Sequence, residues 1–305
     1  MSAPTGIARR RRSIPGIRMR RRTKEKYVRP RGGRGADVLT YLAFLVTLII
    51  FGGPLLWILS LSIKTVAEVN DPSLKLIPDE PTLDNYTQVL NSAQFPTFLI
   101  NSAKLSIGGS LGAMIVAAPA AYAFSRFKFR GKTTALIAVL GLQMIAPLVV
   151  AVPLYRYFAR IDLLDSHFST TMVYIAILMP LATWMLKGFF DEIPRELDEA
   201  AMVDGANRFQ AFVRVILPVA MPGVTAVFLL MAILAWGEFT VPFILLSEPS
   251  LLPVSIGILN FQGTYATTSA QILAAGGVMA MLPAIAIFVA MQRFIVGALT
   301  GAVKG

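Results

Sequence analysis

Long stretches without charged side chains constrain this chain more than any other feature of its sequence. A helix that crosses a bilayer needs about 20 predominantly apolar residues, and residues 38–63 carry no charged side chain over 26 positions. In the second stretch, Gly108 and Gly112 have the spacing that lets two membrane helices approach closely. The six predicted spans are residues 38–63, 105–125, 133–155, 168–186, 224–246 and 272–291. The sequence therefore predicts an all-α membrane protein with six transmembrane helices.

The composition agrees with a membrane protein and argues against several kinds of enzyme. Hydrophobic residues make up 55% of the chain and charged residues 15%, against about a quarter charged in soluble domains. Cysteine is absent and His167 is the single histidine, so a thiolate metal site, a cysteine nucleophile and a Ser-His-Asp triad are not expected. An intramembrane enzyme would need a dyad at membrane depth, such as Ser with His or paired Asp. His167 falls at an outer rim, and no aspartate lies centrally in a predicted span. We predict neither a metal site nor a catalytic residue.

The net charge of +11 is concentrated at the N-terminus. Residues 1–36 hold 13 of the 28 lysines and arginines and one acid, Glu25, whereas the remainder carries 15 basic and 16 acidic residues. So basic and apolar-poor a segment predicts a disordered cytoplasmic tail that contacts anionic membrane lipid. Nucleic acid is not an expected partner, because Tyr27 is the tail's only aromatic residue. The membrane domain is predicted to span residues 37–305.

Basic residues also predict the orientation of the chain. With the N-terminus inside, 23 lysines and arginines fall in the inner segments and five in the outer loops. Because cytoplasmic loops of membrane proteins are enriched in Lys and Arg, we expect both termini inside (N-in/C-in). The loop of residues 187–223 then also lies in the cytoplasm.

Loop 187–223 has the pattern of two short helices separated by a glycine. Pro194 suits a first turn, and acidic residues follow it at the positive end of the helix. Gly205 permits the left-handed turn that ends a helix, and a second amphipathic helix follows it. Small residues at 200 and 201 leave room for another protein, and Glu199 offers a carboxylate to a basic partner. The alternative is a helix lying on the bilayer, but such helices have basic polar faces and this one is acidic.

The same loop resembles the EAA loop of binding-protein-dependent ABC transporter permeases. That pattern is Glu-Ala-Ala, three residues, Gly, nine residues, then a hydrophobic residue, any residue and Leu-Pro. This chain has Glu199-Ala200-Ala201, Gly205 and Val215-Ile216-Leu217-Pro218 at that spacing. Further segments resemble the carbohydrate uptake branch, and within it the maltose-type second permease. They are NSAKLSI (101–107), AYAFSRFKFRGK (121–132), PLYRYFARIDLL (153–164), AWGEF (235–239) and QRFIVGALTGAVKG (292–305).

The resemblance covers residues 37–305 and implies the transmembrane domain of a type I ABC importer, the MetI-like fold. In that family the loop is a coupling helix that docks in a cleft of a cytoplasmic ATPase. The residues that match the coupling motif or support it are Glu199, Ala200, Ala201, Asp204 and Gly205. The implied partners are a second permease subunit, a dimer of ATPase subunits and an extracytoplasmic solute-binding protein, in a bacterial cytoplasmic membrane. The implied cargo is a di- or oligosaccharide such as trehalose or maltose.

A short segment resembles part of a nucleotide-binding motif, but we do not expect it to bind a nucleotide. GKTT at 131–134 resembles the end of a phosphate-binding loop, but that loop needs a glycine five residues before Gly131, where this chain has Arg126. The motif also falls between two predicted spans. We therefore expect no cofactor on this chain, with ATP and Mg²⁺ bound by the partner ATPase.

Four polar or aromatic residues are candidates for the substrate pathway. Glu238 is an ionisable residue within a predicted span, which marks a functional candidate, and Trp236 offers a ring that stacks on sugars. Gln143 and Asn101 are weaker candidates. For Glu238, Gln143 and Asn101 the alternative is a structural hydrogen bond to an adjacent helix. The family often has Asn before the glutamate of the fifth span, and this chain has Gly237 there.

The sequence is also compatible with two other transport functions. A permease for a polyol or a glycerol-phosphate derivative would carry the same coupling motif. A secondary transporter would place ionisable residues in several spans, whereas here Glu238 alone lies deep in a predicted span.

Overall fold

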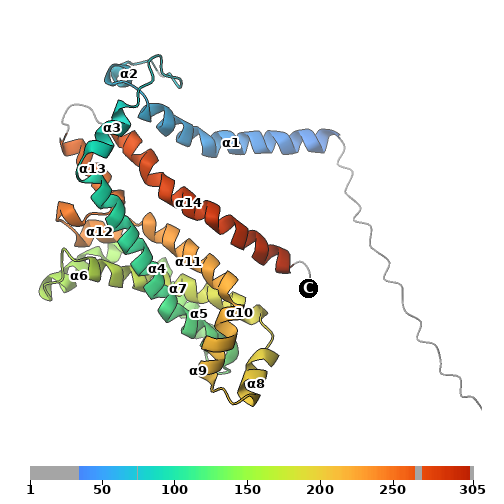
Figure 1. Ribbon diagram of the computed structural model, residues 1–305. Helices are drawn as coiled ribbons and strands as arrows, with labels where there is room; N and C mark the ends of the chain where they lie inside the picture. The colour runs from blue at the N-terminus through green and yellow to red at the C-terminus, as the bar shows by residue number, and fades with distance from the viewer. Residues whose placement is uncertain (1–33, 74, 265–269, 303–305) are drawn as a thin grey trace, which may run out of the picture. The chain divides into compact units, whose positions relative to one another are not determined.

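The computed structural model describes residues 34–73, 75–264 and 270–302, and every regular element within them is a helix (Figure 1). The elements are α1 (Arg34–Ser62), α2 (Val66–Asn70), α3 (Asp84–Asn91), α4 (Phe95–Arg126), α5 (Lys132–Gly141), η1 (Leu142–Met144), α6 (Pro147–Arg160), α7 (His167–Glu192), α8 (Glu196–Val203), α9 (Arg208–Ala211), η2 (Phe212–Ile216), α10 (Leu217–Val219), α11 (Met221–Trp236), α12 (Thr240–Leu245), η3 (Pro249–Leu251), α13 (Val254–Thr264) and α14 (Ala270–Ala302). The predicted basic tail lies outside the described residues, except that Arg34 to Ala36 begin α1.

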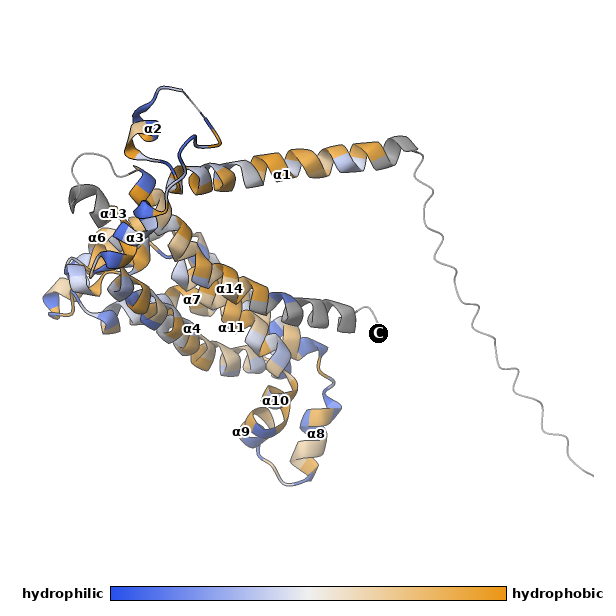
Figure 2. Cartoon of the chain, turned by 45° about the horizontal axis from the view of Figure 1, so that its top comes forward, coloured by the Kyte–Doolittle hydropathy of each residue, from blue (hydrophilic) through white to orange (hydrophobic). Residues whose placement is uncertain are grey.

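The chain divides into two units, residues 1–51 and residues 52–305. In the first unit, α1 is strongly apolar (Figure 2). The side chains of residues 38–50 are exposed. So long and apolar a helix suits a lipid bilayer.

Helices α4 and α7 pack along each other, and α11 packs against both. Glycines on α4 permit this close approach, as the predicted small-residue face requires. A Cβ atom on Gly109 would lie 2.7 Å from the Tyr174 Cβ, and one on Gly112 would lie 2.3 Å from the Ile175 Cδ1. One interhelical hydrogen bond adds to this packing, from the Ser106 Oγ of α4 to the Ala232 carbonyl of α11 at 2.6 Å.

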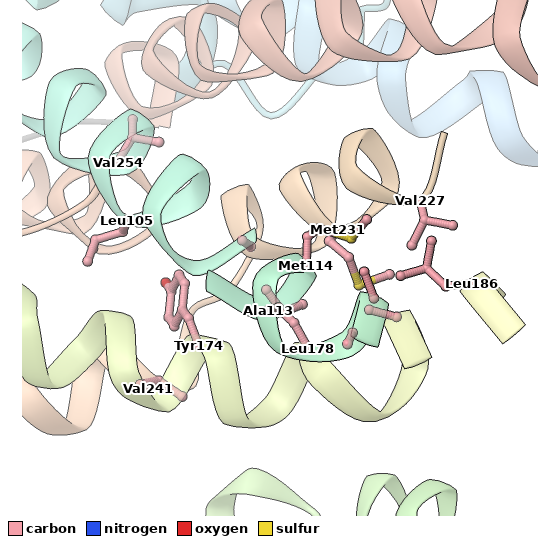
Figure 3. Close-up of a cluster of buried hydrophobic side chains, with 14 of the residues drawn as sticks. Leu105, Ala113, Met114, Tyr174, Leu178, Leu186, Val227, Met231, Val241 and Val254 are labelled. Carbon is pink, nitrogen blue, oxygen red and sulfur yellow. The ribbon is translucent and has the colours of Figure 1, made fainter. Parts of the chain in front are cut away.

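The core of the second unit lies where these three helices meet. Figure 3 shows apolar side chains from each of them converging on one cluster. The labelled side chains include Leu105, Ala113 and Met114 of α4, Tyr174, Leu178 and Leu186 of α7, and Val227 and Met231 of α11. Burial of such side chains stabilises the bundle by about 1.5–3 kcal/mol each in water. In a bilayer, close packing and interhelical hydrogen bonds take over much of that role.

Four described helices are long and apolar enough to cross a membrane: Val38–Ser62, Phe95–Arg126, His167–Glu192 and Ala270–Val289. The third and fifth predicted spans are broken instead of continuous. Lys132–Met144 and Leu148–Arg160 meet at 90°, because Pro147 starts a new helix. The fifth predicted span stops being helical after Trp236 and resumes as α12. A second bent pair, Arg208–Val219 and Met221–Trp236, meets at 79°. If each bent pair is counted as one span, the described residues contain up to six.

One carboxylate ties together the loop between α1 and α3. The Glu68 Oε1 accepts hydrogen bonds from the backbone N–H groups of Asp79 (2.6 Å) and Glu80 (3.0 Å). Its Oε2 accepts one from the Thr65 N–H, at the N-terminus of α2. These bonds, with that to Glu80 contributing most, lower the pKa of Glu68 from its ordinary value of 4.5. The loop is therefore held in shape by an ionised side chain.

Candidate functional site

Helix α8 ends in the left-handed turn that the sequence predicts. Gly205 has φ +89°. The Gly205 N–H donates to the Met202 carbonyl (3.1 Å), and the Ala206 N–H donates to the Ala201 carbonyl (3.0 Å). This pair of bonds is the Schellman motif, which satisfies the last carbonyls of a helix. The turn sets the direction in which the chain leaves α8 toward α9.

All five predicted coupling residues lie on α8 or on the turn that ends it. Glu199, Ala200, Asp204 and Gly205 are exposed. Ala201 is 7% exposed and thus belongs to the interior, since α8 packs against α9 and η2. The sequence interpretation grouped these five residues by motif, and the structure divides them into four surface residues and one packing residue.

Apolar side chains of α8 and of the residues after its terminal turn are only partly covered. Val203 is 87% exposed, and Phe209, across the turn, is 71% exposed. Leu197 is also partly exposed. The reason is the small size of the α8–α9 hairpin, which has too little surface to bury both sides of α8. Exposed apolar side chains beside small residues are typical of a surface that contacts another molecule.

The second half of the loop is anchored to the core. Asn207 begins α9 with a capping box, in which its Oδ1 accepts from the Gln210 N–H and the Gln210 Oε1 accepts from the Asn207 N–H. One turn of π-helix, η2, follows and buries Phe212 and Ile216. The sequence interpretation missed the capping box, although Asn-x-x-Gln before an apolar run is its signature.

Asp198 of α8 makes a buried contact with the last turns of α4. Its Oδ2 lies 2.8 Å from the Arg126 Nε, and its Oδ1 accepts a hydrogen bond of 2.6 Å from the Tyr122 Oη. The side chains of Arg126 and Asp198 are only 7% and 9% exposed. Removing one partner of a buried ion pair costs about 3–5 kcal/mol, because the other charge is left unpaired.

Further contacts join the same end of α4 to the end of α7. The Ser125 Oγ donates to the Asp191 Oδ1 (2.6 Å), and an Arg126 guanidinium nitrogen donates to the Ile193 carbonyl (2.9 Å). Lys187 and Asp191 form an ion pair on α7. This second pair is partly exposed and contributes about 0–1 kcal/mol. The Asp198 contact is thus the strongest polar link to the loop at this end.

A second candidate site is a hollow of about 400 Å³ between α7, α11 and the break after α5. Two of the predicted pathway residues, Gln143 and Glu238, line it together with Tyr174. The Gln143 Nε2 donates to the Ile177 carbonyl at 2.6 Å. The rest of the lining is mostly apolar. A few polar groups on an apolar wall are typical of a small-molecule path.

Glu238 has a structural role as well. Its Oε1 accepts from the backbone N–H groups of Thr240 (2.8 Å) and Val241 (3.1 Å). These N–H groups begin α12 and would otherwise lack intrahelical acceptors. The carboxylate therefore stabilises the break in the fifth predicted span while it faces the hollow.

The other two predicted pathway residues lie elsewhere. Asn101 is buried and donates to the carbonyls of Ser250 and Leu252. The Trp236 Nε1 donates to the Ala280 carbonyl of α14 at 3.1 Å. Asn101 thus makes the structural hydrogen bonds that were its alternative role, and substrate contact by Asn101 or Trp236 stays a prediction. In the described part of the chain, no three histidine or acidic side chains gather as a metal site would require.

The sequence is similar to a known family of transport proteins and to individual members of it. Residues 109–300 match the family model described as "Binding-protein-dependent transport system inner membrane component". The trehalose transport system permease protein SugB of Mycobacterium tuberculosis is 37% identical over 89% of this chain and 100% of its own length. The maltose/maltodextrin transport system permease protein MalG of Vibrio parahaemolyticus is 36% identical over 86% of this chain and 93% of its own.

A solved structure has a similar fold. It is the crystal structure of a bacterial ABC transporter involved in the import of the acidic polysaccharide alginate. One of its chains aligns with a TM-score of 0.70 at 23% identity, over 86% of this chain and 98% of that one. At this identity the likeness concerns the fold.

Proposed function

Because the chain belongs to the family of binding-protein-dependent transport system inner membrane components, we propose that it couples ATP hydrolysis on another subunit to the import of a sugar. It is a multi-pass protein of the bacterial cytoplasmic membrane, with the fold of a type I ABC importer transmembrane domain. It forms half of the translocation pathway, and a second permease subunit forms the other half.

The observation that carries the coupling role is the form of α8. Glu199, Ala200 and Gly205 face solvent at the end of a hairpin whose other side is fixed to the core. A surface of small residues with one carboxylate permits close docking of a protein with a basic cleft. That partner is a cytoplasmic ATPase dimer, which binds ATP and Mg²⁺. This chain supplies no catalytic residue.

The cargo is a di- or oligosaccharide. The relatives named for trehalose and for maltose or maltodextrin support this class, and the hollow lined by Gln143 and Glu238 offers hydrogen-bonding groups to sugar hydroxyls. An extracytoplasmic solute-binding protein delivers the sugar. The chain crosses the membrane six times with both termini inside, as the distribution of Lys and Arg favours.

Purification and transport measurements test this proposal together. The tagged chain is extracted in mild detergent, and we expect an ATPase subunit and a second permease to co-purify with it. The complex, reconstituted with its solute-binding protein in liposomes, should take up labelled trehalose or maltose only when ATP is hydrolysed. Uptake without ATP that collapses with the proton gradient would indicate a secondary transporter instead.

Two variants test the role of α8 within that assay. Gly205→Val and Glu199→Lys are expected to abolish uptake while leaving membrane insertion unchanged. Gly205→Val strains the turn, and Glu199→Lys reverses the charge offered to a basic cleft. Full uptake by both variants would refute the coupling role of this loop.

A further inference from the structure

The residue before the Glu-Ala-Ala motif is buried, whereas the motif itself faces outward. Asp198 points from α8 to the end of α4, where Tyr122 and Arg126 both contact its carboxylate. Tyr122 and Arg126 are four residues apart and so lie on one face of α4. Two helices far apart in the sequence are thus joined by one three-residue contact, here named the α4–α8 clamp (Tyr122, Arg126 and Asp198).

The clamp resists sliding and rotation more than an apolar contact would. Both Asp198 oxygens are engaged, one by a guanidinium and one by a hydroxyl. The charge-assisted hydrogen bond from the Tyr122 hydroxyl fixes the direction of approach as well as the distance. The contact between the Arg126 Nε and the Asp198 Oδ2 is an ion pair without hydrogen-bond geometry. Because the pair is more than nine-tenths buried, any movement that separates it leaves two charges in a medium of low dielectric.

Aromatic packing supports the clamp on its inner side. The Tyr122 ring lies 4.8 Å from the Phe212 ring of η2 and 6.2 Å from the Phe190 ring of α7, measured between centroids. The guanidinium of Arg126 also holds the Ile193 carbonyl, in the segment that leads from α7 to α8. The clamp therefore joins α8, both ends of the loop and α4.

Farther along α4 from the clamp, this helix contacts the two helices that line the hollow, α7 and α11. Helix α4 packs closely along α7 through Gly109, which faces Tyr174, and it is bonded to α11 through Ser106. Tyr174 of α7 and Ala235 of α11 line the hollow. A displacement of α4 must therefore be accommodated by the two helices that form the wall of the proposed sugar path.

We propose that Tyr122, Arg126 and Asp198 are positioning residues that make α8 move as one body with α4. A push on the exposed surface of α8 then moves the wall of the sugar path and does not simply bend the loop. This inference rests on the proposed function. A purely structural ion pair would instead stabilise the chain without affecting how much sugar is moved for each ATP hydrolysed.

The decisive quantity is the ratio of sugar taken up to ATP hydrolysed, measured on the reconstituted complex. Tyr122→Phe removes one hydrogen bond to Asp198 and retains the ring and the ion pair. Tyr86→Phe is the matched control, because Tyr86 has a similar bond (2.7 Å to the Ser62 Oγ) outside the clamp. We expect Tyr122→Phe to lower the ratio about 2- to 5-fold, within the range by which single residues alter coupling, and Tyr86→Phe to leave it unchanged.

Asp198→Asn gives the larger effect, and a double variant separates coupling from folding. Asp198→Asn is expected to lower the ratio about tenfold or more while the ATPase stays active. It leaves Arg126 buried without a counter-charge, so its assembly must be checked. The double variant Arg126→Met, Asp198→Leu removes both charges, a replacement that often preserves stability. It is expected to assemble and still to transport poorly for each ATP hydrolysed.

The outcomes separate this inference from the function on which it rests. If the wild-type complex shows no ATP-driven uptake, the proposed function fails. The wild-type complex can also transport while both Tyr122→Phe and the double variant keep the wild-type ratio of sugar to ATP. In that case the clamp is structural and the inference is overturned. If Asp198→Asn does not assemble, the ratios of Tyr122→Phe and the double variant decide the question.

Discussion

Gly205 shows how one backbone conformation shapes the candidate coupling surface. A Cβ atom there would meet no other atom within 4 Å, so the requirement for glycine comes from φ +89° alone. A residue with a side chain pays about 1–2 kcal/mol in the left-handed region. We expect Gly205→Ala to loosen the end of α8. The measurement is amide hydrogen exchange in the variant, which should be faster at positions 205 and 206 relative to α7.

Gly188 provides the control for that substitution. It lies in α7 near the same end of the bundle, has no positive φ and also has open space around its Cβ position. Gly188→Ala should leave exchange at Ala206 unchanged. Equal exchange in the wild type and in Gly205→Ala would show that the Schellman turn does not depend on glycine.

Glu68 makes the loop between α1 and α3 sensitive to acid. Its pKa is lowered from 4.5 by the hydrogen bonds from Glu80, Asp79 and Thr65, so the ionised form favours the folded loop. The stabilisation is therefore complete above the ordinary pKa and is lost as pH falls below 4.5 through the lowered folded-state value. Amide protection at Asp79 and Glu80 should decrease over that range.

The Thr82 N–H, which donates to the Ile63 carbonyl, is an internal reference for this exchange measurement. In Glu68→Gln, the ratio of protection at Asp79 to protection at Thr82 should lose its pH dependence. A ratio in the wild type that stays constant from pH 6 to pH 3 would contradict the assignment.

At the scale of single residues, the sequence predicted what is local and missed what is distant. The spacing of the motif placed Glu199 on a helix and Gly205 in its terminal turn, because helix ends depend on neighbouring residues. The contact of Asp198 with Tyr122 was not predicted, since these residues are 76 positions apart. Nothing in the local pattern around Asp198 says which helix will lie beside it.

At the scale of helices, the close approach of α4 and α7 gives a direct test. Gly109→Ala would place a Cβ 2.7 Å from the Tyr174 Cβ, an atom that cannot move without its helix. Overpacking of this kind costs about 1–3 kcal/mol, which corresponds to a Tm lower by about 2–4 °C per kcal/mol. The thermal stability of the purified protein in detergent measures this change.

Gly277 of α14 is the matched glycine, with open space at its Cβ position. Gly277→Ala should keep the wild-type Tm or raise it slightly. If Gly109→Ala is equally stable, α4 and α7 do not pack as described.

The sequence predicted the existence of the membrane helices better than their continuity. Apolar length alone predicts a span, and within α1, α4, α7 and α14 the structure has continuous helices long and apolar enough to be one. It does not reveal where a span breaks. The break before Pro147 was readable in principle, because proline starts helices. The break at Glu238 depends on a carboxylate that caps α12, which requires knowing the backbone on both sides.

At the scale of the whole molecule, the proposed orientation can be tested by labelling. The chain has no cysteine. A single cysteine introduced at an exposed position is therefore the only residue of the chain that a maleimide labels. Asp71→Cys and Arg160→Cys should react with a membrane-impermeant maleimide on intact cells. Lys128→Cys and Glu196→Cys should react only after the membrane is opened. The reverse pattern would place the α8 surface outside the cell and exclude a cytoplasmic ATPase partner.

The measurement that tests the central claim most directly is a crosslink from α8 itself. A photoreactive amino acid replaces Ala200 in the assembled, purified complex. Ile77, in the loop between α1 and α3, serves as the control position because both residues are exposed. We predict an adduct between position 200 and the ATP-hydrolysing subunit, weakened by Glu199→Lys and absent from position 77. Adducts of position 200 with lipid alone would mean that α8 lies on the bilayer, and the coupling role would be wrong.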